Sequence, residues 1–349
     1  MNNMNYLGLD VHKKTISYCL RQADGTILRE ETIEATREAL SALLESMPQP
    51  WSAGLEATMF SAWIYDHIRA QGGGTVKVAH STMLKAIAAG KRKNDRLDAR
   101  KIADLLRCDY FPECHMASPE IRNRRRVLRY RNLLVRQAVR MKTKVSGLLM
   151  ETGIPYNKSK LHSKKYFYQM LEEQRSEMPE SLPELLQLSR TSIETLTRMD
   201  YQLLSALEHD RLLAARVERL RTIPGVGTVV ALTWALEIGD VHRFASLKKV
   251  VSCCGLCGAE RSSAGKQRRT PISKQRNHHL QTVLVEAAKL APRWHSELAL
   301  VYDREKQRGN RNRATLAVAR KLAAYLLAVD RGEREYQETA PSHEVCRVA

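Results

Sequence analysis

The stretch Tyr6-Leu7-Gly8-Leu9-Asp10-Val11 decides the fold of the N-terminal part of the chain. It is a short apolar run that carries one acidic residue near its end, and a second run of strand type, residues 15–20, follows it closely. A buried carboxylate is costly unless a partner or a metal ion compensates its charge. Asp10 is therefore expected to have a partner. A carboxylate that caps a turn at the strand end is the alternative that this stretch leaves open.

The composition favours a nucleic-acid-binding protein. A chain of 349 residues can form roughly two or three domains. The formal net charge of +19 favours a polyanionic partner, and nucleic acid is a better candidate than an acidic membrane surface. No apolar run of ~18 residues and no signal peptide is visible, which predicts a cytoplasmic, nucleoid-associated protein. Four Phe and four Trp are too few for a single-strand binder built on stacking.

The first part of the chain predicts an α/β fold, because strand-like and helix-like patterns alternate along it. Strands are expected over residues 6–11, 15–22, 26–33, 51–57 and 75–79, and helices over residues 38–47, 60–70 and 82–89. In such sheets, polar residues at the carboxyl ends of strands converge on one crevice. Asp10 and Glu56 both end a strand, so they are expected to lie together.

Two further acids follow at the start of a predicted helix. Asp95 and Asp98 are three residues apart and share one helix face, with Asn94 or Asp95 as the N-cap. Taken alone, this segment favours Asp95 and Asp98 as surface charges paired with neighbouring basic residues, which are Arg92, Arg96 and Lys101. Together with Asp10 and Glu56 they form the oxygen-ligand set that Mg²⁺ or Mn²⁺ prefers. Such ions assist phosphodiester chemistry.

The order and spacing of these residues resemble the IS110 family of transposases, the DEDD recombinases related to the Piv invertase. The matching segments are Gly8-Leu9-Asp10-Val11-His12-Lys13, Leu55-Glu56-Ala57-Thr58 and Lys93-Asn94-Asp95-Arg96-Leu97-Asp98-Ala99. The resemblance implies an RNase H-like (RuvC-like) domain whose metal-binding acids are Asp10, Glu56, Asp95 and Asp98. Met59 stands where the family usually has Gly, a difference expected to alter the loop behind Glu56.

A strongly basic helix is predicted next, because residues 121–150 contain no acidic residue. Val127, Leu134, Met141 and Leu148 recur every seven residues and predict an apolar seam. A helix of one charge sign is expected to find its counter-charge outside the chain, in nucleic-acid phosphates. The candidate contacts are Arg122, Arg125, Arg126, Arg129, Arg136, Arg140 and Lys144.

The helical pattern then continues towards Leu220, with Ile193, Leu196, Leu203 and Leu207 as its apolar positions. A helical hairpin that packs on itself and a coiled coil between subunits both explain it. The resemblance implies a coiled coil used in oligomerisation, with dimers that assemble into a tetramer.

A Gly-rich turn opens the C-terminal part. In Pro224-Gly225-Val226-Gly227, which resembles a helix-hairpin-helix element, Gly225 and Gly227 would let backbone N–H groups approach a phosphate. Packing of the turn against another protein element is the alternative. Cys254-x-x-Cys257 has metal-ligand spacing, but no second pair follows it, and buried thiols are favoured over zinc.

Two serines, Ser262 and Ser263, are predicted to lie in a flexible basic loop. The cations around them could stabilise charge on a phosphate but could not activate a hydroxyl. They are Arg261, Lys266, Arg268, Arg269 and Lys274, and all are candidate nucleic-acid contacts. The segment is similar to the C-terminal motif of the IS110 family, which places the recombination nucleophile on Ser263, with Ser262 as the fallback. Ala264 replaces the usual Gly, and Cys257-Gly258 replaces a small residue and Pro.

The chain is thus expected to comprise an α/β metal-binding domain, a helical middle and a mostly helical C-terminal domain. The predicted bounds are residues 1–115, 116–220, 221–332 and, for an unstructured tail, 333–349. The resemblance implies a transposase in which Mg²⁺ assists attack by Ser263 on double-stranded DNA, guided by a structured bridge RNA. A metal-dependent RuvC-like nuclease or Holliday-junction resolvase that uses water is the rival. A binder without catalytic activity, in which the acids are structural, is a second rival.

Overall fold

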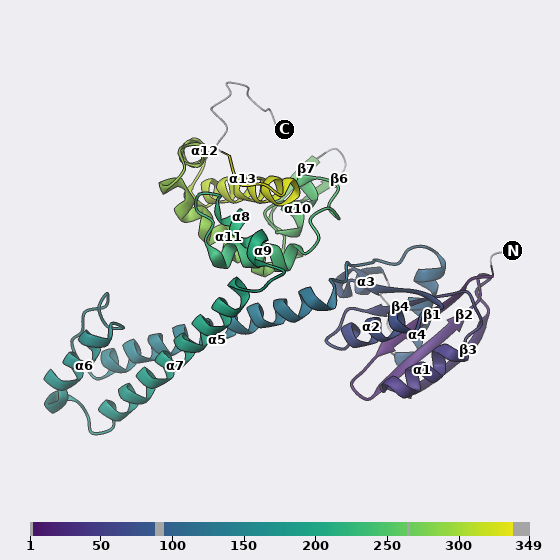
Figure 1. The fold of residues 1–349 in the computed structure, drawn as a ribbon, viewed down its shortest axis with the longest axis horizontal. Coiled ribbons are helices and arrows are strands. Elements are labelled where there is room, and N and C mark those ends of the chain that lie inside the picture. Colours follow the sequence, from purple (N-terminus) through teal and green to yellow (C-terminus); the bar gives the residue numbers. More distant parts are fainter. Residues whose placement is uncertain (1–2, 88–93, 264–265, 338–349) are drawn as a thin grey trace. The chain divides into compact units, whose positions relative to one another are not determined.

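The computed structural model of the protein describes residues 3–87, 94–263 and 266–337 and divides the chain into two compact units (Figure 1). Unit 1 spans Met1–Pro119 and unit 2 spans Glu120–Ala349. Among the helices that the structure describes, none is both long enough and apolar enough to cross a membrane.

Unit 1 is built on a five-stranded sheet whose order is β3-β2-β1-β4-β5. The strands are β1 (Asn5–Val11), β2 (Thr15–Arg21), β3 (Ile27–Glu34), β4 (Trp51–Glu56) and β5 (Gly74–Ala79). Strands β1, β2 and β3 pair antiparallel, whereas β4 pairs parallel with both β1 and β5. The segment around Asp10 is therefore the central strand of a mixed sheet.

The alternation of side chains along β1 sorts its residues between two faces of the sheet. Leu7 and Leu9 are fully buried in a core shared with two helices, α1 (Arg37–Glu45) and α2 (Ser61–Gln71). Gly8 and Asp10 point to the opposite face, where the helix α4 (Asp95–Arg107) packs. Helix α3 (Ser81–Ile87) precedes α4 in the chain. The predicted α/β architecture is confirmed.

Two glycines let α4 lie directly on the sheet. A Cβ atom on Gly8 would be 2.0 Å from the carbonyl oxygen of Ala99, and one on Gly54 would be 2.7 Å from a methyl carbon of Leu106. Gly8 and Gly54 are register partners in β1 and β4. Each stands two residues before an acid, and so on the same face as Asp10 or Glu56.

Unit 2 begins with a helical hairpin. The long helix α5 (Pro119–Glu151) packs beside α7 (Leu182–Glu208), and α6 (Lys164–Glu173) and the short η1 (Arg175–Glu177) connect them (Figure 1). Leu134 of the predicted seam is buried, whereas Val127, Met141 and Leu148 are only partly buried. The other buried apolar positions of α5 are Leu128, Ala138, Val145 and Leu149. The structure therefore shows the self-packed hairpin within one chain.

The rest of unit 2 is a helical core around the fully buried Trp234. Its elements are α8 (Ala214–Arg221), α9 (Thr228–Ile238), α10 (Leu247–Cys253), α11 (His278–Leu290), η2 (Ala291–Arg293), α12 (Ser296–Gln307) and α13 (Arg311–Gly332). A helical part after the α/β part was predicted and is confirmed.

Two local predictions are corrected here. The segment of Ser262 and Ser263 is no loop, because β6 (Gly258–Ser263) pairs antiparallel with β7 (Lys266–Ile272). Tyr336, expected in an unstructured tail, shares a hydrogen bond of 2.7 Å with His295, and its backbone N–H donates to Thr222. These two bonds hold Tyr336 on the helical core.

Candidate functional site

Asp10 lies at the carboxyl end of the central strand, and 16% of its side chain is exposed. Burial raises the pKa of its carboxyl group above the ordinary value. The neighbouring His12 lowers this pKa, while the negative charges of Asp95 and Asp98 raise it. The surroundings therefore disfavour the ionised carboxylate, and a cation at this point would relieve that cost.

Asp95 and Asp98 occupy the first turn of α4, and Asn94 is its N-cap, with a side-chain oxygen that accepts the N–H of Arg96 at 3.0 Å. More than half of the Asp95 side chain is exposed. Asp98 accepts a hydrogen bond of 3.0 Å from Lys101. Asp98 thus forms the ion pair with a basic neighbour that was predicted for a surface charge. Asp95 instead faces Asp10.

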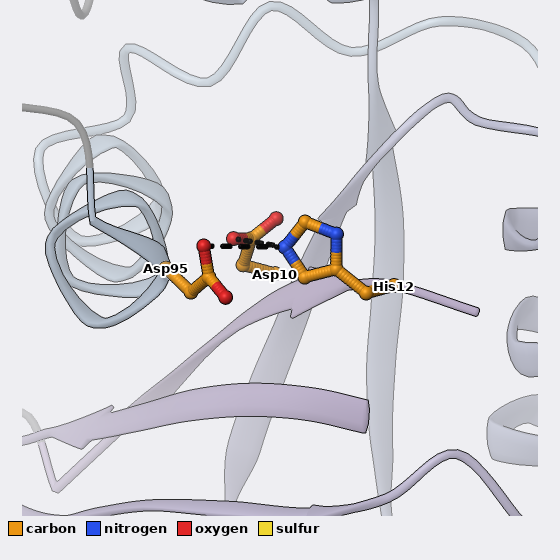
Figure 2. Close-up of side chains that lie close together, drawn as sticks. All are labelled: Asp10, His12 and Asp95. Atoms are coloured by element: carbon orange, nitrogen blue, oxygen red, sulfur yellow. Dashed lines mark hydrogen bonds and ion pairs between the residues drawn. The ribbon is translucent and has the colours of Figure 1, made fainter. Parts of the chain in front are cut away.

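One ring nitrogen of His12 faces both the Asp10 and the Asp95 carboxylates (Figure 2). Its Nε2 atom is 3.2 Å from Oδ2 of Asp10 and 3.4 Å from Oδ1 of Asp95. One ligand atom from each residue falls within 4.8 Å of the others. No role was predicted for His12, although its position two residues after Asp10 was a usable signal.

Glu56 ends β4 beside Asp10, because Leu9 and Leu55 are parallel register partners directly before the two acids. Its side chain is half-buried. Within the described part of the chain, Glu56 and Asp98 do not join the tight group of Asp10, His12 and Asp95. The donor set fits a divalent cation, since carboxylate oxygens and an imidazole nitrogen are ordinary ligands of such ions.

The arginines of α5 divide into two sets. Arg129 forms two bonds of 2.8 and 2.9 Å to the carboxylate of Glu237 on α9, and Arg125 donates to the Leu236 carbonyl. The Glu237 side chain is fully buried. Arg125 and Arg129 thus have internal counter-charge, contrary to the expectation that all counter-charge on this helix is external. Their role as nucleic-acid ligands stays a prediction.

The second set faces solvent. Arg136, Arg140 and Lys144 are exposed at intervals of four residues, and so form one stripe along α5. In the described residues none of these three has an ion pair with a carboxylate. Arg126 is exposed and donates a hydrogen bond to Asn123, and Arg122 is half-buried. A stripe of this kind suits nucleic-acid phosphates.

The Gly-rich turn has a protein neighbour. Gly225 has a φ of +85°, and a Cβ atom on it would be 2.6 Å from that of Ala291. Gly225 therefore permits the turn to pack closely on η2. Packing against another protein element was the alternative to phosphate binding in the sequence analysis. Gly227 is the N-cap residue of α9, with open space beside it.

The candidate nucleophile lies in the second unit. The backbone of Ser263 pairs with that of Lys266 at the end of the β6–β7 hairpin, and Ser262 pairs with Gln267. The side chains of Arg261, Ser262, Ser263, Lys266, Arg268 and Arg269 lie outside the described residues. Lys274, just beyond the hairpin, is exposed. Cys254 is buried, which raises the pKa of its thiol, and no metal-ligand group of the described residues includes it.

Two family models match the chain. One describes a DEDD transposase related to IS110 and matches residues 7–154. The other describes the transposase IS116/IS110/IS902 family and matches residues 217–303.

Several named proteins are similar over most of the chain. A transposase for insertion sequence element IS1328 from Yersinia enterocolitica is 26% identical over 298 residues, which cover 83% of this chain and 84% of that protein. A probable family 20 transposase from Pseudomonas aeruginosa is 24% identical over 83% of this chain and 85% of its own. A transposase for insertion sequence element IS1111A from Coxiella burnetii is 25% identical, over 70% of this chain and 68% of that protein.

Proposed function

We propose that this chain, which matches two family models of IS110-type transposases, moves an insertion element by metal-assisted serine attack on DNA phosphodiesters. The observation that carries this proposal is the meeting of Asp10, Asp95 and His12 at the end of the central strand. It supports an RNase H-like catalytic unit in which Glu56 and Asp98 complete the acidic set.

The acids would hold Mg²⁺, or Mn²⁺ in its place, which when bound supplies positive charge to the scissile phosphate. Ser263 Oγ forms a bond to phosphorus as the bond from phosphorus to the leaving sugar oxygen breaks. The hydroxyl proton passes to a carboxylate of the acidic set, and the leaving oxygen takes up a proton. The phosphoserine link conserves a phosphodiester for rejoining. Ser263 belongs to unit 2 and the four acids belong to unit 1.

The exposed stripe of Arg136, Arg140 and Lys144 supports binding of double-stranded DNA along α5. Guidance by a bridge RNA and assembly of dimers into a tetramer rest on the family resemblance alone. In the proposed division of labour, base pairing reads the sequence while the protein binds the backbone.

The rival function is a nuclease or Holliday-junction resolvase in which the acids activate water. It is favoured by the acidic group itself, which needs no serine to cleave DNA. The test is a trapping experiment with end-labelled DNA that spans an element junction, RNA transcribed from the flanking segment, and Mg²⁺. Our proposal expects a protein–DNA adduct that survives denaturation, is lost in Ser263→Ala and persists in the matched control Ser262→Ala.

Other results of that experiment decide against the proposal. Cleavage without any adduct in the unaltered protein supports the nuclease. An adduct that persists in Ser263→Ala and disappears in Ser262→Ala moves the nucleophile by one residue. Cleavage that continues in Asp10→Asn removes the acids from the mechanism.

A further inference from the structure

We infer that His12 binds the metal ion directly through Nε2, beside Asp10 and Asp95, and biases the site towards Mn²⁺. This inference rests on the proposed metal-dependent function and adds a nitrogen ligand to a site otherwise described by carboxylates. It also makes His12 a determinant of metal specificity.

The first support is that the backbone of His12 is held in place. Its N–H donates a hydrogen bond of 2.9 Å to the carbonyl oxygen of Thr15, which closes the turn between β1 and β2. Val11 and Ile16 are the last register pair before that turn. The imidazole therefore projects from a fixed turn directly beyond the strand that carries Asp10.

The second support is the geometry of the three donor atoms. Cations such as Mg²⁺ bind their ligands at about 2.1 Å in octahedral arrangement, which places adjacent ligand atoms about 3 Å apart. The distances from Nε2 to the two carboxylate oxygens, 3.2 and 3.4 Å, are close to that edge length. All three donors lie within 4.8 Å of one another, so one ion could contact them together.

The third support is that a single Nε2 atom faces two carboxylates (Figure 2). One N–H hydrogen cannot point at both Asp10 and Asp95, because a hydrogen bond weakens steeply away from a straight line. A metal ion is not limited in this way, since it accepts one electron pair from each donor. About half of the His12 side chain is exposed, which leaves the ring room to adjust when an ion enters.

The chemical consequence is a change in metal preference. Mg²⁺ favours an all-oxygen environment, whereas imidazole nitrogen suits transition metals, and Mn²⁺ accepts both kinds of donor. With His12 as a ligand, the site should bind Mn²⁺ more tightly than Mg²⁺. Replacement of His12 should reduce the ratio of the two affinities.

The experiment uses the full chain with Mn²⁺ and pulsed electron paramagnetic resonance, which detects a nitrogen-14 nucleus bonded to the ion. Variants are His12→Gln and the matched control His67→Gln. His67 lies on α2 in the same unit, where it shares a hydrogen bond with Ser41. Thermal unfolding checks first that each variant is folded.

We expect nitrogen coupling in the unaltered protein and in His67→Gln, and its loss in His12→Gln. The Mn²⁺ affinity of His12→Gln should fall at least about tenfold, and its Mg²⁺ affinity should fall less. Bound Mn²⁺ without nitrogen coupling, or coupling that survives in His12→Gln, would overturn the inference and leave the carboxylate site standing. No Mn²⁺ binding at all would overturn both the inference and the proposed metal-dependent function.

Discussion

Gly8 faces Ala99 so closely that a side chain on residue 8 would enter the backbone of α4, with only 2.0 Å from its Cβ to the Ala99 carbonyl oxygen. Two residues along β1 advance about 6.6 Å, and four residues along α4 advance about 6 Å. Asp10 lies two residues after Gly8 along the strand, and Asp95 lies four residues before Ala99 along the helix. The contact therefore sets how closely the two acids approach.

Gly8→Ala is expected to push α4 off the sheet. The unfolding free energy of unit 1 should fall by about 1–3 kcal/mol, the usual cost of overpacking a core, and Mn²⁺ affinity should fall with it. Calorimetry and metal titration measure the two effects. Gly147→Ala is the control, because residue 147 lies within α5 with open space around it. There alanine should stabilise unit 2 by about 0.5–1 kcal/mol. Equal stability of Gly8→Ala and the unaltered protein would refute the packing argument.

Asp10→Asn is expected to stabilise the metal-free protein slightly while it removes the response to metal. Because the folded state raises the pKa of Asp10, folding becomes less favourable as pH rises through that pKa, and the full cost is present at neutral pH. The neutral amide avoids the cost of burying a charge, so the unfolding free energy without metal should rise by about 1 kcal/mol at most. The corresponding rise in Tm is a few degrees or less. The increase in Tm that Mn²⁺ causes should disappear. A metal-free Tm well below that of the unaltered protein would contradict this account.

Glu237→Gln tests the buried ion pair that joins α5 to α9. Burial alone would raise the pKa of Glu237, but bonds from Arg129 and Asn277 and the charge of Arg125 hold it below the ordinary range. The ionised carboxylate thus stabilises unit 2 above the ordinary pKa of glutamate, and this contribution is lost as pH falls through the lowered value.

The amide variant should cost about 3 kcal/mol at neutral pH, because two guanidinium groups lose their counter-charge. Its unfolding free energy should also depend less on pH below the ordinary pKa of glutamate. Urea unfolding at a series of pH values measures both. Glu286→Gln is the control, since Glu286 pairs with Lys289 on the surface, and its effect should stay within about 0.5 kcal/mol. Parallel pH curves for Glu237→Gln and the unaltered protein would exclude the linkage.

Arg140→Gln is expected to weaken DNA binding through loss of one phosphate contact. The slope of log affinity against log salt concentration should become shallower by about 0.9. Arg131→Gln should leave the slope unchanged, because Arg131 is engaged by Asp200 on α7. Binding to a mixed-sequence duplex at several salt concentrations measures the slopes. An unchanged slope for Arg140→Gln would remove the exposed stripe from the interface.

The elements of unit 1 could be predicted because each carries a local signal. Leu7 and Leu9 alternate with Gly8 and Asp10, and Asp95 follows an N-cap residue, so the strand and the helix both followed from short windows of sequence. The reason for Gly8 could not be found in this way. It depends on the backbone of Ala99, which only the folded chain brings near.

The same limit applies to charge pairing in unit 2. In sequence, Arg125 and Arg129 resemble Arg136 and Arg140, and nothing local separates those that meet Glu237 from those that face solvent. The partner lies on a helix far along the chain, inside an otherwise apolar segment. The β6–β7 hairpin was missed for a different reason. Its strands are rich in Ser, Arg and Lys, which carry no alternating apolar pattern.

The dependence of the acidic set on α4 has a consequence during synthesis. A nascent chain that ends before α4 already contains Asp10 and His12, but it lacks the helix that presents Asp95 and Asp98. Since domains fold as units while the chain emerges, the acidic set cannot be complete until α4 has left the ribosome and packed on Gly8. A truncated translation product would thus carry the first strands of the sheet without the two acids of α4.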